Sequence, residues 1–180
     1  MNIENSLDEI TERFLVQFKG LSSPELNWKP SPEKWSIAQI LDHIITINES
    51  YYPTFDALLK DEYKLSFLAK IGFLVNWFGN IILKSVEPNR RKKIKTFSIW
   101  EPSKSDINED ILDHFLIHQK ELKKRLSQLE KHIEDGSVIA SPANKNIVYK
   151  LSKAIEIIIS HEIRHYNQAV DIYQIIKQES

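Results

Sequence analysis

The most chemically informative residues are two histidines near the end of the 180-residue chain, in the sequence His161-Glu162-Ile163-Arg164-His165. Residues four apart on a helix project from the same face, so two imidazoles at this spacing can bind one divalent ion. Both histidines interrupt an apolar stripe, where a nitrogen left without a partner would cost about 1–3 kcal/mol. A shared metal ion would satisfy both side chains. The stripe, at steps of three and four residues, consists of Ala154, Ile158, His161, His165, Gln168, Ile172 and Ile176.

A third ligand is expected, because catalytic zinc sites usually have three protein ligands and an open position. His43 is the favoured candidate, since it lies between isoleucines near the edge of the apolar stripe of an earlier predicted helix. A lone histidine there would more often be an ordinary core residue, but the C-terminal pair reverses that expectation. The alternative is His118, which faces the core of another helix and follows His114 by four residues. His132 is expected at the surface.

The same C-terminal residues also fit the peptidase pattern His-Glu-x-x-His, in which the glutamate is a general base. Such peptidases usually take their third ligand from downstream, whereas no histidine follows His165. No substrate-binding edge strand is evident upstream either, so a peptidase is not favoured. On a regular helix Glu162 and Arg164 point away from the histidine face, which favours ion pairs over catalysis for both.

Several other side chains are predicted to lie in or near the site. Gln168 lies one turn beyond His165 and could hydrogen-bond a ligand, with an ordinary polar surface role equally open. Tyr51, two turns beyond His43, could line a cavity, and His118 is expected close to the ligands if it is not one itself. Trp35 is expected to pack as a hydrophobic staple at the start of the helix that carries His43, in preference to acting as a substrate platform.

The elements that would position these residues are predicted to be helices, because glycine is scarce and no alternating strand pattern runs for long. Capping boxes begin at Ser6 and Ser36, a further start signal begins at Asp106, and Gly136 is a C-cap. Pro53 kinks the second helix or ends its first half. The predicted main helices span 6–20, 36 to about 60, 106–136 and 152–177, with Pro24, Pro30, Pro32 and Pro142 in loops. The pattern predicts one all-α domain over residues 1–180, a four-helix bundle with a long crossover that contains an extra helix.

Composition narrows the function classes. The chain has 24 basic and 25 acidic residues, and its one basic cluster, Arg90-Arg91-Lys92-Lys93, is interpreted as a solvated loop, so no nucleic-acid partner is expected. Cysteine is absent, which excludes disulfides, thiolate ligands and cysteine nucleophiles. The acidic N-terminus does not resemble a signal peptide, and a cytoplasmic location is expected.

The apolar segment 65–83 is about as long as a bilayer span. It contains Lys70, Asn76 and Asn80, and a central lysine costs about 2.5–3.5 kcal/mol on insertion. We therefore predict a buried or lid-forming helix packed on the main body of the protein, with no membrane partner. A patch used for dimerisation is the next alternative.

Three places in the sequence resemble the DinB superfamily, including its YfiT-like members that are classed as metal-dependent hydrolases. The first is Trp28-x-Pro30 followed by Lys34-Trp35-Ser36-Ile37-Ala38-Gln39-Ile40-Leu41-Asp42-His43-Ile44, similar to the family's Trp-Ser-x-x-Gln-x-Leu-x-His block. The second is the long crossover, and the third is His161-Glu162-x-x-His165-x-x-Gln168. The resemblance implies an up-down-down-up bundle, a site of His43, His161 and His165, zinc or nickel as the metal, and a homodimer.

The chemistry implied by this resemblance has two forms. Three neutral imidazoles leave the full charge on the ion, which would lower the pKa of a coordinated water toward about 7 and favour hydrolysis. Related proteins also include transferases that use low-molecular-weight thiols such as bacillithiol and mycothiol. A small-molecule substrate is expected in either case. A noncatalytic metal-binding or stress-response module, or a purely structural bundle, remains the alternative.

Overall fold

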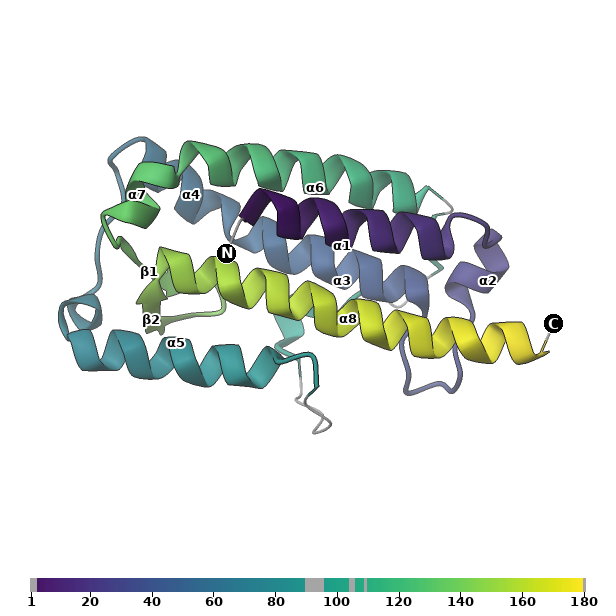
Figure 1. The fold of residues 1–180 in the computed structure, drawn as a ribbon. Helices are drawn as coiled ribbons and strands as arrows, with labels where there is room; N and C mark the ends of the chain where they lie inside the picture. The colour runs from purple at the N-terminus through teal and green to yellow at the C-terminus, as the bar shows by residue number, and fades with distance from the viewer. Residues whose placement is uncertain (1–2, 90–95, 104–105, 109, 180) are drawn as a thin grey trace.

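The computed structural model describes residues 3–89, 96–103, 106–108 and 110–179 (Figure 1). Four long helices run side by side: α1 (Ile3–Phe18), α3 (Ile37–Ser50), α6 (Ile111–Gln128) and α8 (Leu151–Glu179). Helices α1 and α3 each pack against both α6 and α8, which closes the bundle. Helices α1 and α8 point one way and α3 and α6 the other, so the expected all-α class and up-down-down-up topology are confirmed.

The interior of the bundle contains two apolar clusters separated by a polar layer. One cluster gathers the residues near the start of α3 and the end of α8, and the other gathers those near the end of α3 and the start of α8. Fully buried polar side chains on these two helices lie between the clusters. The buried polar residues on α3, α6 and α8 are Gln39, His43, Asn48, His118, Gln119, His161, Glu162 and His165.

Several predicted helix boundaries are confirmed. The Ser36 hydroxyl accepts from the Gln39 amide, and the Gln39 side chain accepts from the Ser36 amide, so the capping box that starts α3 is present. The second helix breaks at Tyr51, two residues before Pro53, and continues as α4 (Tyr52–Leu59). Gly136 has φ of +68°, the left-handed conformation that favours glycine after a helix.

Other boundaries differ from the predictions. Helix α1 begins at Ile3, so Ser6 lies inside it and its capping box is wrong. Helix α6 begins at Ile111, not at Asp106, and its last turn is separate as α7 (Glu130–Glu134). A short helix, α2 (Ser23–Asn27), replaces part of the predicted loop, because Pro24 is tolerated in a first turn where no amide partner is lost.

A β-hairpin precedes α8 where the sequence predicted only a loop. Strand β1 (Val138–Ser141) pairs antiparallel with β2 (Asn144–Lys150), and Pro142 lies in the turn. The β-branched and aromatic residues of these strands are typical of a sheet, but β1 is too short for an alternating pattern to stand out.

The crossover between α3 and α6 carries the predicted extra helix as α5 (Gly72–Val86), with 3₁₀ turns at Phe67–Lys70 and Ser98–Trp100. Helix α5 packs against β2 and α8 as a wall on the bundle. A methyl group on Gly79 would lie 2.8 Å from Lys153 Cγ and 3.2 Å from Tyr149 Cβ, so glycine permits this close approach. Among the described residues no helix is both long and apolar enough to cross a membrane.

Candidate metal centre

His43 enters the site from the middle of α3 and is fixed by the crossover. Its Nδ1 lies 2.6 Å from the Trp100 carbonyl oxygen. A carbonyl can only accept, so Nδ1 carries the proton and Nε2 keeps its lone pair. This is the arrangement that commonly orients a metal-binding histidine, with one nitrogen donating to an oxygen and the other free to ligate.

His161 and His165 enter from one face of α8, as their spacing predicts. His165 Nδ1 lies 3.1 Å from Gln168 Oε1, so the predicted hydrogen bond is present, with the glutamine oxygen accepting from the histidine. The Nε2 atoms of the two histidines are 3.0 Å apart. Nδ1 of His161 is buried and lacks a hydrogen-bond partner in the described structure.

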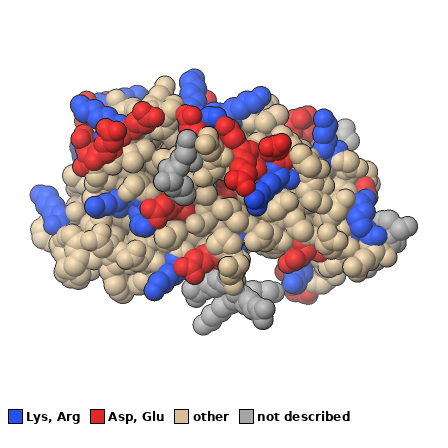
Figure 2. Space-filling model, viewed as in Figure 1, with Lys and Arg blue, Asp and Glu red and all other residues tan. Residues whose placement is uncertain are grey.

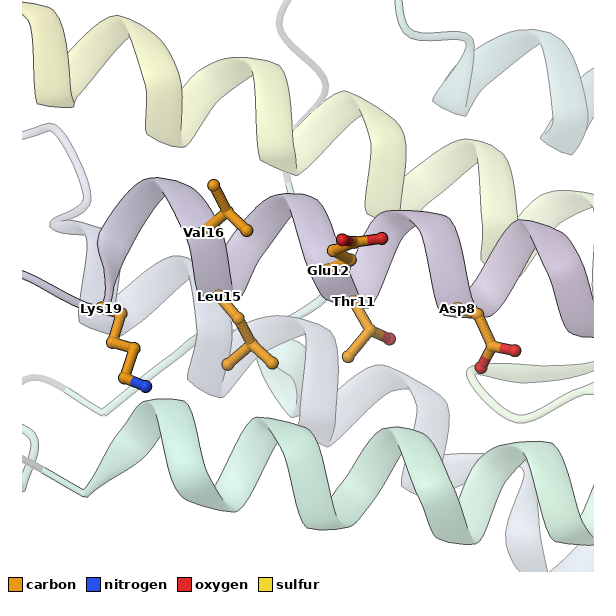
Figure 3. Close-up of a pocket in the computed structure, with 6 residues that line it drawn as sticks. All are labelled: Asp8, Thr11, Glu12, Leu15, Val16 and Lys19. Carbon is orange, nitrogen blue, oxygen red and sulfur yellow. The ribbon is translucent and has the colours of Figure 1, made fainter.

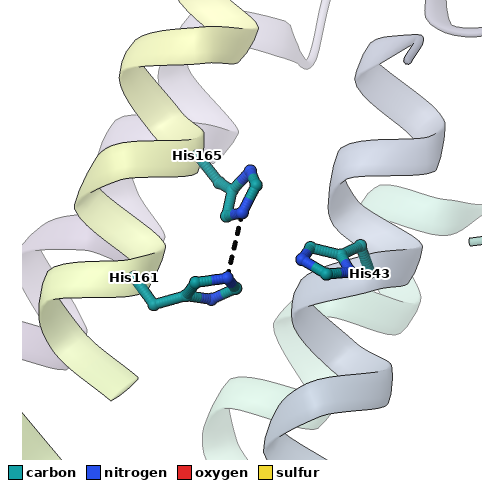
Figure 4. A group of neighbouring side chains, drawn as sticks. All are labelled: His43, His161 and His165. Carbon is teal, nitrogen blue, oxygen red and sulfur yellow. Dashed lines mark hydrogen bonds between the residues drawn. The ribbon is translucent and has the colours of Figure 1, made fainter. Parts of the chain in front are cut away.

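The three histidines meet in the polar layer of the bundle. Figure 4 shows the ring of His43 facing the rings of His161 and His165 across the space between α3 and α8. One ligand atom from each residue lies within 4.8 Å of the others, a grouping that could hold a metal ion. We call His43, His161 and His165 the histidine cluster. The early histidine therefore does converge with the late pair, 118 residues away along the chain at its nearest.

Burial keeps the histidine cluster uncharged. It lowers the pKa of His43 to about 4, although the bond to the Trp100 carbonyl partly opposes the shift. It also lowers the pKa of His165 to about 3, with the neighbouring His43 and Arg164 adding to the effect. The pKa of His161 is well below its ordinary value for the same reason. Neutral imidazoles are the form that binds metal, so no proton need be displaced from these nitrogens at neutral pH.

A cavity of about 600 Å³ opens beside the histidine cluster. Trp35 stacks on His165, with ring centroids 5.9 Å apart, and lies 4.6 Å from the ring of His43. The tryptophan expected to act as a staple thus contacts two rings of the histidine cluster and lines the cavity, and Tyr51 lines the cavity as predicted. Helix α5 supplies part of an apolar wall, and charged residues from α8 add to the lining. Other lining residues include Lys34, Ile47, Ile82, Val86, Phe97, Trp100, Ile147, Tyr149, Ile158, Arg164 and Asp171.

A second hollow, of about 410 Å³, follows the outer face of α1 (Figure 3). Residues of that helix and Lys19, which directly follows it, line the hollow, and none belongs to the histidine cluster. The side chains in Figure 3 lie along the helix without converging on a common point. This hollow therefore offers no candidate site.

His118 belongs to a different group of buried polar side chains. Its Nε2 lies 3.2 Å from Asn48 Nδ2, and its Nδ1 lies 3.2 Å from the Tyr52 hydroxyl. It is absent from the cavity lining, and the expectation that it lies close to the three histidines stays a prediction. The rival pair with His114 is also not formed, because His114 is exposed and pairs with Asp110 at 3.1 Å.

Glu162 joins this second group and not an ion pair. Its Oε1 accepts from Asn48 Nδ2 at 2.7 Å and from Gln119 Nε2 at 2.9 Å. Burial raises the pKa of the carboxyl to about 7, against the effect of these two donors. We call Asn48, His118, Gln119 and Glu162 the amide network. Arg164 instead lines the cavity and donates to the Glu87 carbonyl at 3.1 Å.

Sequence reasoning missed the amide network and the carbonyl that holds His43. The network joins α3, α6 and α8, and its members become neighbours only when those three helices pack. The Trp100 carbonyl is a backbone group, so its residue type carries no signal of the bond. Asn48 and Gln119 are polar residues on otherwise apolar helix faces, and this was the sequence signal that could have indicated the network.

The chain belongs to the DinB superfamily, whose defining sequence pattern matches residues 6–169 and so includes the whole histidine cluster. It is also similar to the uncharacterized protein YuaE of Bacillus subtilis (strain 168), with 27% identity over 163 residues. That match covers 90% of this chain and 91% of YuaE. No solved structure matches the chain. The family resemblance seen in the motifs is thus confirmed, while the activity must be argued from the site.

Proposed function

We propose that the protein is a metal-dependent enzyme in which His43, His161 and His165 hold one divalent transition metal ion, zinc or nickel. The observation that carries the proposal is the convergence of three buried, neutral imidazoles beside a cavity. The Nε2 atoms of His161 and His165 can share at most one proton and Nδ1 of His161 has no partner among the described residues, so the cluster has more acceptors than donors, and a shared cation would satisfy them.

The hydrogen bonds around the histidine cluster fit a metal. Trp100 and Gln168 each accept the Nδ1 proton of one histidine, which leaves Nε2 of His43 and of His165 for ligation. These bonds also fix the planes of the two rings. No acidic side chain takes part in the grouping, so the ligand set is neutral.

When bound, the ion would supply Lewis acidity that lowers the pKa of a coordinated water or thiol. The chain's own residues then have defined tasks. Trp35 and the apolar wall exclude bulk water, and Arg164 offers a positive charge within the cavity. Glu162 takes no part, because it faces Asn48 and Gln119, so the peptidase-like role of this residue is not supported.

The substrate we propose is a small molecule, because a cavity of about 600 Å³ lies within the usual range for small ligands. Hydrolysis and transfer of a low-molecular-weight thiol both need an open position on the ion. The cavity beside the cluster favours such an open position over the closed environment of a structural metal site. It therefore favours an enzyme over a noncatalytic module.

Elemental analysis tests the metal site. Protein purified without a histidine tag should contain, or take up on addition, about one equivalent of zinc or nickel. His43→Ala and His161→Ala should each reduce this below about a tenth of an equivalent, whereas the control His132→Ala should not. Wild-type protein that takes up no zinc or nickel would overturn the proposal.

A thiol-dependence assay then separates the two reactions. Metal-loaded protein is given chlorodinitrobenzene with and without bacillithiol, and separately given nitrophenyl acetate. Thiol-dependent consumption of the electrophile supports S-transfer, and thiol-independent ester cleavage supports hydrolysis. His161→Ala should abolish whichever activity is found. Full metal occupancy with neither activity on a broad substrate panel would favour the noncatalytic alternative.

A further inference from the structure

The crossover carries a group of exposed apolar side chains. Leu65, Phe67, Phe73, Trp77 and Ile81 are each between 44% and 76% exposed. Phe73, Trp77 and Ile81 follow one another at steps of four residues, so they form a stripe along one face of α5. We call these five residues the apolar face. Contiguous exposed apolar patches on a protein of this size usually mark an interaction site.

The apolar face is distinct from the side of α5 that packs on the protein. Val75 and Gly79 are the buried residues of α5, and this helix packs against β2 and α8. Ile82 and Val86 line the cavity beside the histidine cluster. The inner side of the helix is thus already in use, and the outer stripe has no partner within the described chain.

Three exposed lysines lie along the segment that carries the apolar face, and acidic residues flank this segment at both ends. Between residues 63 and 86 the charged side chains are Lys64, Lys70 and Lys84, and all three are exposed. The nearest acidic residues in the sequence are Glu62 and Glu87, although the whole chain has a net charge of −1. Figure 2 shows mostly uncharged surface over the left part of α5, whereas acidic and basic side chains are mixed over the upper helices.

We infer that the apolar face docks on the surface of a bilayer that contains anionic lipids. Exposed tryptophan and phenylalanine are suited to the headgroup level of a membrane, and flanking lysines attract anionic headgroups. Helix α5 has 15 residues and lies along the body of the protein, so it would lie on the membrane and not cross it. The sequence-based expectation of no membrane partner rested on the cost of inserting Lys70, and surface docking leaves that lysine in water.

A second copy of the chain fits this face less well. An antiparallel two-fold pairing of α5 would bring Lys70 of one copy near Lys84 of the other, and a parallel pairing would place each lysine near its own counterpart. No acidic residue between 63 and 86 compensates for these like charges. Anionic headgroups would compensate for them directly.

Vesicle co-sedimentation of the full chain tests the inference. The probes are vesicles of phosphatidylcholine alone and vesicles of equal parts phosphatidylcholine and phosphatidylglycerol. We expect at least about fivefold more protein bound to the anionic vesicles, with the difference reduced in high salt, because screening weakens attraction by the lysines. The proposed vesicle binding does not involve the metal, so metal-free and metal-loaded protein should bind vesicles equally. The result therefore tests the membrane inference even if the proposed metal site is wrong.

Matched substitutions locate the surface. The double variant Phe73→Ser and Trp77→Ser should bind anionic vesicles about tenfold less, since two interfacial anchors are removed. The control changes Val16→Ser and Ile117→Ser, at residues that are 78% and 64% exposed on other helices. The control should bind as wild type and sediment as wild type without lipid. Absence of vesicle binding, or equal loss in both variants, would overturn the inference. A dimer without lipid that the Phe73 and Trp77 changes dissociate would also overturn it, with a second copy as the occupant.

Discussion

The histidine cluster and the amide network contain adjacent residues of α8, His161 and Glu162. They differ in the hydrogen-bonding partner that each cluster lacks. His161 turns toward α3 and the cavity, whereas the next residue, Glu162, turns toward Asn48 and Gln119. In the amide network an acidic oxygen meets two amide donors. In the histidine cluster three neutral bases meet one another, and the two Nε2 atoms of α8 can share at most one proton.

The difference shows what marks a ligand site in a helical bundle. Burial of polar groups alone does not, because both clusters are buried and both lie between the apolar clusters. The histidine cluster has more hydrogen-bond acceptors than donors and lies beside a cavity. A cation would take the place of the missing donors. The amide network needs only a proton, which Glu162, with its pKa raised to about 7, can retain.

Metal addition should produce the largest contrast between the clusters. At a free metal concentration a thousand times the Kd, binding to the folded state should raise the free energy of unfolding by about 4 kcal/mol. His161→Gln should lose this increment, whereas Glu162→Gln should keep it, although the two residues are neighbours. Denaturant unfolding with and without zinc measures both. An equal increment in wild type and His161→Gln would place the metal elsewhere.

Replacement of Glu162 by an apolar residue should have the next largest effect. It should lower the free energy of unfolding without changing the metal content. Glu162→Leu leaves the amides of Asn48 and Gln119 without their acceptor, which should cost about 2–4 kcal/mol of unfolding free energy. Glu162→Gln keeps an acceptor and should cost less than about 1 kcal/mol. Metal content should stay at the wild-type level in both variants. Loss of metal from the glutamine variant would mean that the two clusters are coupled.

Acid should destabilise the metal-free protein through His118. Burial lowers its folded-state pKa from 6.5 to about 4. The folded state therefore disfavours the proton, and the stability contributed by neutral His118 is present above pH 6.5 and lost as the pH falls toward 4. The linkage predicts a loss of about 2 kcal/mol between pH 7 and pH 5 from this residue. His118→Gln should flatten the slope of unfolding free energy against pH by that amount, and an unchanged slope would contradict the assignment. Glu49, 3.7 Å from His118 Nδ1, is half exposed and offsets little of the burial cost.

Loss of the Gln168 hydrogen bond should produce the smallest effect. Gln168→Ala removes the acceptor for His165 Nδ1 and should weaken metal binding about tenfold, the lower end of the range for such orienting partners. Asn167→Ala, a neighbour that also lines the cavity, is the control and should bind metal as wild type. Competition with a chromogenic chelator measures both affinities. Equal affinity in the two variants would leave Gln168 as an ordinary polar residue.

Much of the bundle and the histidine cluster could be predicted from the sequence because both depend on local spacing. The Ser36 cap, the break near Pro53 and the i, i+4 histidines follow from neighbouring residues. His43 was preferred to His118 from the residues alone, and the family motif agreed with that choice. The amide network and the hairpin before α8 were missed, because Asn48, Gln119 and Glu162 come together only through tertiary packing, and β1 has four residues.

The bond between His43 and residue 100 has a consequence for how this site can be altered. Because the acceptor is a main-chain oxygen, every amino acid at position 100 supplies it, and a side-chain scan will not register its contribution to metal affinity. The bond depends instead on the path of the main chain. Lengthening or shortening the link between α5 and α6 should therefore change the affinity of the proposed metal site, while all three histidines stay in place. Engineering of the proposed metal site could therefore begin with loop length and leave the three histidines untouched.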